Sequence, residues 1–348
     1  MPLSLPAPRL LPADGAPSLR WGVVGTGIAA RFVDALHAHT TQRVVAVTAR
    51  DAEKTADFAL EHRIPTVHVS VSALVNDPRV DVVYISTPHP LHRDLALEAI
   101  AAGKHVLVEK PIAMSAREAE EITSAGRAAG VLVTEAMWTR YLPQADVIRQ
   151  VLDEGLLGEV NLVRADFGFV FPFEPTHRLW SAELGGGALL DAGVYPISFA
   201  SSVLGAPAAV HAVGERSETG VDARADLLLT HASGAVAMLS TSLRTSLPTT
   251  ASIMGSAGRL EIASPFFGPS ALALTLEPSD AAGSGGSAET ALWRDDSFAT
   301  LHEGLSCQAT AFAGYVADGR LESPLHPHAE IVSVMATIDE ARRQVGTV

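Results

Sequence analysis

The feature that most constrains the fold is a regular alternation of apolar runs and helical stretches after residue 18. The runs LRWGVVG, RVVAVTA, DVVYIST and HVLVE are rich in Val, Ile and Leu, and a stretch with helical spacing follows each of them. Strands that are apolar on both faces are typical of a parallel sheet covered by helices on each side. The sequence therefore predicts an α/β domain with a doubly wound parallel sheet over residues 19–138.

The second half of the chain has a different pattern. VNLVRADFGFVF at 160–171 alternates between apolar and polar residues over most of its length, and further short strands follow it. Period-two alternation gives one packed and one solvated face, which is typical of an antiparallel sheet. We predict that residues 139–348 form an α+β domain with a large open, mostly antiparallel sheet. The run AAGSGGSAE at 281–289 is expected to be a flexible loop, and residues 1–18 a flexible arm.

Composition argues against some classes of partner. The formal net charge is −14, whereas nucleic acids and anionic membranes require a basic surface. No long uncharged apolar run suggests a membrane span, and the proline-rich arm lacks the features of a signal peptide. The single cysteine, Cys307, excludes an internal disulfide and fits a reducing compartment. We expect a cytoplasmic protein that binds a small molecule.

The pattern G-x-G-x-x-A at residues 25–30 lies after the first strand and opens a helix. Gly25 permits a tight turn, Gly27 leaves room for a pyrophosphate, and Ala30 allows close packing of helix and strand. Amides at the start of the helix would then face the phosphates. A glycine-rich turn without a ligand is the alternative, but the position favours dinucleotide binding. The predicted contacts are Gly25, Thr26, Gly27, Ile28 and Ala29.

The end of the second strand discriminates between NAD and NADP. NAD sites usually place an acidic residue there to bind the ribose hydroxyl groups. This chain has the neutral residues Thr48 and Ala49, followed by Arg50. Arg50 is able to pair with a 2′-phosphate, although a solvated arginine beside Asp51 is the alternative. We therefore favour NADP over NAD as the cofactor.

Two further strand ends carry polar residues. Ligands bind outside the carboxyl ends of the strands in such sheets, so Thr87, Pro88 and His92 are expected to border the nicotinamide. No carboxylate or thiol completes a ligand set with the nearby histidines, so no metal is expected. Glu109 and Lys110 end the next strand. They are either charges at a solvated strand end, or a lysine directed into the crevice and held by the glutamate.

GGGALLDAGVYPI at 185–197 contains Asp191 and Tyr195. Four residues apart on a helix, the two side chains lie on one face. A tyrosine near a lysine cation ionises more readily, so the pKa of Tyr195 is expected to fall if Lys110 lies close to it. The alternative is a tyrosine and an aspartate with only structural roles at the start of a helix.

The chain resembles the Gfo/Idh/MocA oxidoreductase family over residues 19–348. The motifs that carry the resemblance are GTGIAA, STPHPLH, AGKHVLVEKP and GGGALLDAGVY. The last of these, with EAMWTRYLP, is similar to the branch that contains dimeric dihydrodiol dehydrogenase and NADP-dependent D-xylose dehydrogenase. The resemblance implies a Rossmann domain, and a second domain that binds substrate and forms a homodimer through its sheet. It also implies a catalytic pair, Lys110 and Tyr195, assisted by Asp191, and a cis peptide bond before Pro111.

These observations predict an NAD(P)-dependent oxidoreductase that acts on a secondary alcohol or carbonyl group of a sugar, polyol or cyclic diol. In this hypothesis Tyr195 relays the hydroxyl proton, Lys110 stabilises the developing oxyanion, and Asp191 orients them. Glu109, Trp138 and Arg140 are further candidate cofactor contacts. The candidate pocket residues are Trp138, Phe169, His177 and Arg178. The alternatives are a dinucleotide-binding regulator without turnover and an NAD-dependent glycoside hydrolase on the same fold.

Overall fold

The computed structural model describes residues 3–278 and 287–347, so most of the run at 281–289 lies outside the described residues. The chain divides into two compact units. The parallel-sheet unit comprises Leu10–Tyr141 and Ala299–Met335, and the mixed-sheet unit comprises Met1–Arg9, Leu142–Phe298 and Ala336–Val348. The chain therefore leaves the first unit after residue 141 and returns to it at residue 299.

The parallel-sheet unit contains six strands in the order β3-β2-β1-β4-β5-β6, and all neighbouring strands are parallel. This order, with a switch point between β1 and β4, confirms the predicted doubly wound α/β fold. The strands are β1 (Arg20–Val24), β2 (Arg43–Thr48), β3 (Thr66–Val67), β4 (Val82–Ile85), β5 (His105–Val108) and β6 (Val133–Glu135).

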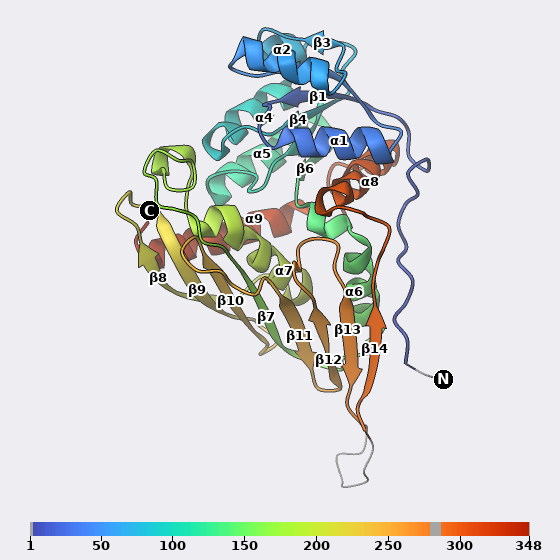
Figure 1. Ribbon diagram of the computed structural model, residues 1–348, viewed down its shortest axis with the longest axis vertical. Coiled ribbons are helices and arrows are strands. Elements are labelled where there is room, and N and C mark those ends of the chain that lie inside the picture. Colours follow the sequence, from blue (N-terminus) through green and yellow to red (C-terminus); the bar gives the residue numbers. More distant parts are fainter. Residues whose placement is uncertain (1–2, 279–286, 348) are drawn as a thin grey trace. The chain divides into compact units, whose positions relative to one another are not determined.

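Helices cover both faces of this sheet. α1 packs beside α8 on one face, and α4 packs beside α5 on the other (Figure 1). Side chains cap several of these helices; Ser115, for example, accepts a hydrogen bond from the Glu118 amide at the start of α5. The helices of this unit are α1 (Ala29–His39), α2 (Ala52–Glu61), α3 (Val71–Val75), α4 (His92–Ala101), α5 (Ala116–Ala129) and α8 (Leu305–Ala317).

An aromatic cluster joins the returning segment to the core of the parallel-sheet unit. The Trp21 ring on β1 lies 5.5 Å from Phe32 on α1 and 5.1 Å from Phe312 on α8. Phe32 also lies 4.3 Å from Tyr84 on β4, and all four side chains are almost fully buried. This packing explains why residues 299–335 group with the first unit, an exchange that the predicted boundaries of 19–138 and 139–348 do not include.

The mixed-sheet unit contains eight strands in the order β14-β13-β12-β11-β7-β10-β9-β8. Every neighbouring pair is antiparallel except β7 and β10, which confirms the predicted mostly antiparallel sheet. The strands are β7 (Val160–Gly168), β8 (Ala209–Arg216), β9 (Asp222–Thr230), β10 (Val236–Ser242), β11 (Ala251–Gly255), β12 (Gly258–Ile262), β13 (Leu272–Leu276) and β14 (Glu289–Trp293).

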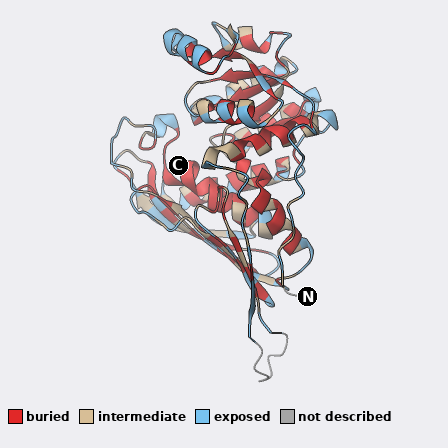
Figure 2. Cartoon of the chain, turned by 45° about the vertical axis from the view of Figure 1, so that its right-hand side comes forward, coloured by how far each residue is buried: buried red, intermediate tan, exposed pale blue. Residues whose placement is uncertain are grey.

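The inner face of this sheet is covered by helical segments. α7 (Val194–Leu204) and the π-helical turn Leu189–Gly193 before it pack on β7 and β10. Along β9 and β10 buried residues largely alternate with more exposed ones, and Figure 2 colours each residue by this burial. α6 (Pro143–Asp153) belongs to this unit, and α9 (His328–Val345) extends into it from the parallel-sheet unit.

The proline-rich arm is attached to the mixed-sheet unit at its beginning. The Arg9 amide donates a hydrogen bond to Asp146 Oδ2 at 2.7 Å, and the side chain of Gln150 donates to the Ala7 carbonyl at 2.9 Å. Both partners lie on α6. The arm that the sequence predicts to be flexible is therefore anchored over residues 7–9.

The helical stretch Ala182–Leu204 is long and apolar enough to cross a membrane, although the sequence suggested no such segment. Within the described residues it is the one stretch with these properties, and 78% of its most apolar window is buried inside the structure. Burial of this extent is expected for a core helix that packs against a sheet.

Candidate active site

The turn between β1 and α1 has the geometry that the glycine pattern predicts. Gly25 has φ of +102°, and a Cβ atom there would lie 2.8 Å from the Ser86 carbonyl oxygen. A side chain at Gly27, in contrast, would meet nothing within 4 Å. Gly25 is therefore required by the backbone itself, whereas Gly27 leaves an open space beside the start of α1.

The same turn fits the pyrophosphate of a dinucleotide. The residue before α1, Ile28, offers no side-chain cap, so the first amides of the helix have no side-chain acceptor. An anion in the space beside Gly27 would accept hydrogen bonds from such amides. The buried hydroxyl oxygen of Thr87, after β4, also has no hydrogen-bond partner among the described residues. These features fit a bound NAD(P) group.

The end of β2 presents a cation to solvent. Thr48 is buried and Arg50 is exposed. The Asp51 side chain is engaged by α2, because it accepts a hydrogen bond from the Lys54 amide at 3.1 Å and forms an ion pair with the Lys54 ammonium at 3.7 Å. The acidic side chain nearest to the strand end therefore serves as a helix cap.

His92 lies beneath the surface of the carboxyl edge. Its Nδ1 atom is 2.9 Å from the Pro111 carbonyl oxygen, and its Nε2 atom is 2.8 Å from the Thr87 carbonyl oxygen. The residue is fully buried, and burial lowers the pKa of its imidazole group. In this arrangement the ring links the loops that follow β4 and β5, while its expected contact with a cofactor stays a prediction.

Glu109 and Lys110 follow β5 at the same edge of the sheet. The Glu109 carboxylate accepts hydrogen bonds from the Tyr84 hydroxyl and, at 3.1 Å, from the Lys110 amide. Burial raises the pKa of Glu109, whereas these hydrogen bonds and the Lys110 charge oppose the rise. The predicted cis bond between Lys110 and Pro111 is present. Glu109 thus binds the backbone amide of Lys110, while the direction of the Lys110 side chain and its contact with the glutamate stay a prediction.

Trp138 and Arg140 lie on a short 3₁₀ helix, Trp138–Tyr141, and both are buried. Arg140 forms an ion pair with Glu330 within the parallel-sheet unit. Burial opposes ionisation of Glu330, but the His326 ring 3.7 Å away and the charge of Arg140 together lower its pKa to about 2. Their contact with a cofactor stays a prediction.

Tyr195 lies in the mixed-sheet unit, on the first turn of α7. Its ring centroid is 5.8 Å from that of Phe167 and 4.8 Å from that of Phe267. Asp191 lies on the preceding π-helical turn and accepts a hydrogen bond from Arg178 at 2.8 Å. The structure therefore places Asp191 and Tyr195 on consecutive helical segments, together with aromatic rings and an arginine.

Two other predicted pocket residues also lie in the mixed-sheet unit. The His177 ring packs 4.3 Å from the ring of Phe171, and Phe169 lies 5.7 Å from Phe167. Lys110 and Trp138 belong to the parallel-sheet unit. The convergence of Lys110 with Tyr195 stays a prediction.

The sequence did not identify Asp222 as a residue of interest. Its Oδ2 atom accepts a hydrogen bond from the Leu189 amide at 2.6 Å, at the start of the π-helical turn. Burial raises the pKa of Asp222 to about 6. A Cβ atom at Gly187 would collide with this carboxylate, so the third glycine of the GGG run is required by its packing. The only signal in the sequence was that run.

Glu135 and His326 were also missed as a pair. The Glu135 Oε1 atom accepts a hydrogen bond from the Ile112 amide, and its Oε2 atom lies 2.8 Å from His326 Nε2. Both side chains are 1% exposed. The sequence did show a glutamate at the end of a buried strand. Nothing near His326 in the sequence indicates that it contacts this glutamate.

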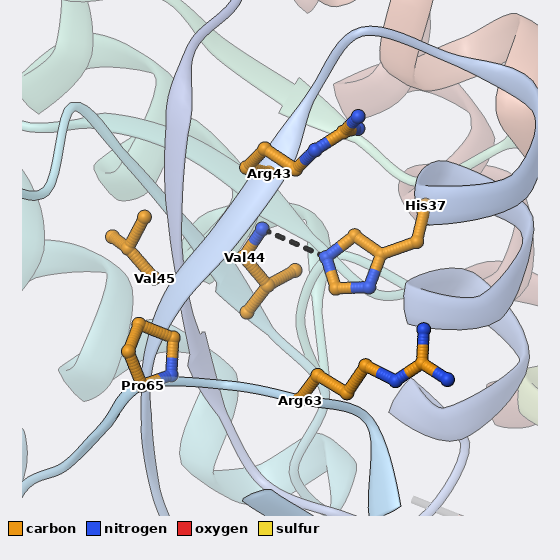
Figure 3. Close-up of a pocket in the computed structure, with 6 residues that line it drawn as sticks. All are labelled: His37, Arg43, Val44, Val45, Arg63 and Pro65. Carbon is orange, nitrogen blue, oxygen red and sulfur yellow. Dashed lines mark hydrogen bonds between the residues drawn. The ribbon is translucent and has the colours of Figure 1, made fainter.

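A separate hollow of about 420 Å³ lies at the opposite edge of the parallel sheet. Figure 3 shows His37, Arg43 and Arg63 around it, with the start of β2. The His37 ring accepts a hydrogen bond from the Val44 amide at 3.1 Å, and Arg43 donates to the carbonyl groups of Thr40 and Gln42. These groups serve the local turn, and the hollow is remote from the strand ends described above.

Within residues 3–278 and 287–347, no cluster of three metal-binding side chains is present.

The strand order, the glycine turn and the open space beside α1 are those of a dinucleotide-binding domain. Residues 19–137 match the model of an oxidoreductase family with an NAD-binding Rossmann fold, and residues 146–261 match the GFO/IDH/MocA C-terminal domain. The chain belongs to the Gfo/Idh/MocA family, which confirms the resemblance. It is an NAD(P)-dependent oxidoreductase.

Named relatives share most of the chain. The trans-1,2-dihydrobenzene-1,2-diol dehydrogenase of Mus musculus is 34% identical over 337 residues, which cover 94% of this chain and 97% of the mouse protein. The Homo sapiens enzyme of the same name is 34% identical over 334 residues, with the same coverage. These matches place the chain close to the dihydrodiol dehydrogenase branch.

Solved structures of similar fold include KijD10, a 3-ketoreductase from Actinomadura kijaniata in complex with NADP and TDP-benzene. It is 29% identical, with a TM-score of 0.79, and the match covers 94% of this chain and 98% of KijD10. A levoglucosan dehydrogenase in complex with NADH and levoglucosan has a TM-score of 0.84 at 20% identity, covering 94% of this chain and 97% of that chain. The second match shows a shared fold.

Proposed function

We propose that this oxidoreductase acts on a secondary alcohol or carbonyl group of a ring-shaped substrate, either a cyclic diol or a sugar. The observation that carries the proposal is the surroundings of Tyr195. The rings of Phe167 and Phe267 flank its phenol ring, and the Arg178–Asp191 ion pair lies one turn earlier. Aromatic walls suit the apolar face of a ring, and the ion pair suits its hydroxyl groups.

The chemical roles are divided between the cofactor and the chain. Bound NADP supplies hydride transfer at the nicotinamide. Tyr195 takes the hydroxyl proton during oxidation and returns it during reduction. The Lys110 ammonium stabilises the developing oxyanion and favours ionisation of the phenol. Asp191, paired with Arg178 at 2.8 Å, orients these groups.

We assign the cofactor site to residues at the carboxyl edge of the parallel sheet. The glycine turn would hold the pyrophosphate, and the residues after β4 and β5 would border the nicotinamide. The set is Gly25, Thr26, Gly27, Ile28, Ala29, Arg50, Thr87, Pro88, His92, Glu109, Lys110, Trp138 and Arg140. For His92 we assign an indirect role, because both of its ring nitrogens face backbone carbonyl groups.

We favour NADP over NAD because of Arg50. This side chain is exposed directly after β2, and Asp51 caps α2 instead of facing a ribose. KijD10 was solved with NADP, which supports the same choice. The ratio of dissociation constants for NADPH and NADH tests it, and a ratio that Arg50→Ala leaves unchanged would argue against this role.

We propose that the mixed-sheet unit provides substrate binding and homodimer formation, and that the protein is cytoplasmic. Support for a dimer comes from the outer face of the sheet, where Leu228 and Met238 lie opposite each other on β9 and β10. They are 41% and 46% exposed, respectively. Exposed apolar residues on a long sheet are typical of a surface that pairs with another chain.

A spectrophotometric assay tests the proposed function against its alternatives. The purified protein is incubated with NADP or NAD and a panel of cyclic diols, aldoses and polyols. A net change at the reduced-nicotinamide band supports a dehydrogenase. Sugar release without a net change indicates a hydrolase, and dinucleotide binding without any reaction indicates a regulator. Either of these two results would contradict the proposal.

A further inference from the structure

Side chains, rather than the backbone of the sheet, hold the turn that carries Lys110. The Lys110 amide donates to its neighbour Glu109 at 3.1 Å. The Pro111 carbonyl lies 2.9 Å from His92 Nδ1, and the Ile112 amide donates to Glu135 Oε1 at 2.8 Å. Three consecutive residues therefore depend on three side chains for their backbone hydrogen bonds.

Glu135 is the one of these three side chains that comes from another strand of the sheet and has partners on both carboxylate oxygens. It ends β6, the strand next to β5, and it is 1% exposed. One carboxylate oxygen accepts from the Ile112 amide, and the other lies 2.8 Å from His326 Nε2. Burying a carboxylate is costly unless its oxygens are bonded, so the site requires both donors.

His326 lies between this carboxylate and the ion pair of Glu330 with Arg140. It lies between α8 and α9, in the segment that returns to the parallel-sheet unit, and is also 1% exposed. Its Nδ1 atom is 3.7 Å from Glu330 Oε2, and Glu330 pairs with Arg140. A row of charged and polar groups therefore runs from the Lys110 turn to Arg140.

Stability alone does not explain this row. A buried ion pair contributes little to folding compared with well-packed apolar residues, because desolvation offsets the attraction. The directional bonds of a carboxylate do, however, fix the position of the amide that they bind. A lysine that must face a reacting oxygen needs such a fixed backbone, because its four-carbon side chain is flexible.

We propose that Glu135, supported by His326, is a positioning residue that sets the place of Lys110 in the active site. The proposal rests on the proposed function, in which Lys110 acts on the reacting oxygen. Loss of the Glu135 carboxylate frees the Ile112 amide and loosens the turn from one side. We expect the glycine turn after β1 to keep its hold on the dinucleotide, since β4 and β5 separate β1 from β6, the strand that Glu135 ends.

The first test separates kcat from cofactor binding. We expect Glu135→Ala to lower kcat roughly 10- to 100-fold, the scale of a displacement of about 1 Å. The Kd for NADPH changes less than about threefold, a shift below 1 kcal/mol. Glu135→Gln retains an oxygen for the Ile112 amide and recovers most of kcat. A kcat for Glu135→Ala that stays near the wild-type value, or falls only with the folded fraction, would overturn the proposal.

His328 provides a matched control for the histidine. It is 1% exposed, lies two residues from His326, and its Nε2 atom is 2.9 Å from the Val133 carbonyl oxygen on β6. We expect His326→Ala to lower kcat and His328→Ala to leave it unchanged, even where both lower the melting temperature. Equal effects of the two variants on kcat would contradict the positioning role.

Amide hydrogen exchange distinguishes failure of this inference from failure of the proposed function. It is measured on the full chain without substrate, so it does not depend on turnover. We expect Glu135→Ala to speed exchange at Ile112, while His328→Ala leaves that amide protected. Unchanged exchange at Ile112 in folded Glu135→Ala protein would overturn the inference, whatever the enzyme's substrate proves to be.

Discussion

Lys110 is the residue on which the proposed chemistry depends most. It follows β5 in a turn held by His92 and Glu135, at the edge of the sheet where ligands bind. Lys110→Ala removes the cation that stabilises the oxyanion, so we expect kcat to fall by about 10²–10³-fold. Steady-state kinetics measure kcat, and a titration with NADPH measures the affinity for the cofactor separately. A near-normal kcat, or an affinity for NADPH that falls as much as kcat does, would contradict a role of Lys110 in stabilising the oxyanion.

Asp222 gives the protein a pH-dependent contribution to stability. Its pKa is raised from 3.8 to about 6 in the folded state, so the folded protein holds this proton more tightly than the unfolded chain. The stabilisation is therefore complete below about pH 4. It is lost as pH rises through 6, by roughly 3 kcal/mol in total.

Asp222→Asn removes this titration but keeps an oxygen for the Leu189 amide. Relative to the wild type, we expect the free energy of unfolding of the variant to increase between pH 4 and pH 7. Urea denaturation across this range measures the difference. Asp226→Asn, at a half-exposed position on the same strand, is the control. Parallel pH profiles for the wild type and Asp222→Asn would show that the Asp222 pKa is not raised.

At the scale of elements, the β1–α1 turn contains one glycine that the fold requires, Gly25, and one that we expect only cofactor binding to require, Gly27. A Cβ atom fits at Gly27, where nothing lies within 4 Å. We expect Gly27→Ala to leave the melting temperature unchanged and to weaken NADPH binding on the order of tenfold, or about 1.4 kcal/mol. Unchanged affinity of this variant for NADPH would contradict binding of the pyrophosphate beside Gly27.

Gly25→Ala is the matched contrast. Its φ of +102° is strained for any residue with a Cβ atom, and that atom would lie 2.8 Å from the Ser86 carbonyl oxygen. We therefore expect a loss of about 1–3 kcal/mol in the free energy of unfolding, measured by denaturation. Equal stability of the two alanine variants would contradict this division of roles.

Much of this element-level organisation was predictable because its signals are local. Apolar runs predicted the parallel strands, and Gly25 and Gly27 marked the turn. The resemblance to the family predicted the cis bond before Pro111. Glu135 and His326 were not found as a pair, because they are 191 residues apart in the sequence and His326 belongs to the returning segment, whose helix α8 packs on α1. The spacing of apolar residues predicts which face of a helix or strand is buried, but it does not predict which distant residue that face contacts.

The π-helical turn at 189–193 was missed for a related reason. The sequence analysis placed Asp191 and Tyr195 four residues apart on one helix, whereas the structure has a π-helical turn over Leu189–Gly193 and begins α7 at Val194. The Asp222 carboxylate binds the Leu189 amide, and Gly187 leaves space for that carboxylate. This local geometry thus depends on a residue from a neighbouring strand, which the spacing of apolar residues does not encode.

At the scale of the whole molecule, the outer face of the mixed sheet is the proposed dimer surface. We expect Met238→Lys, and more strongly Met238→Lys with Leu228→Lys, to convert the dimer to a folded monomer, because apposed lysines repel. Sedimentation velocity measures the mass, and circular dichroism verifies the fold. A wild-type monomer, or a dimer unaffected by both substitutions, would contradict this placement.

The central claim concerns the complete protein and the reaction that it performs. The most direct measurement is absorbance at the reduced-nicotinamide band, after each cyclic diol or sugar of the panel is added to the wild-type protein and to Tyr195→Phe, with NADP. We predict a steady rise for the wild type and none for Tyr195→Phe at the same NADP occupancy. Equal rates for the two proteins, or no rise with any diol or sugar, would contradict the account.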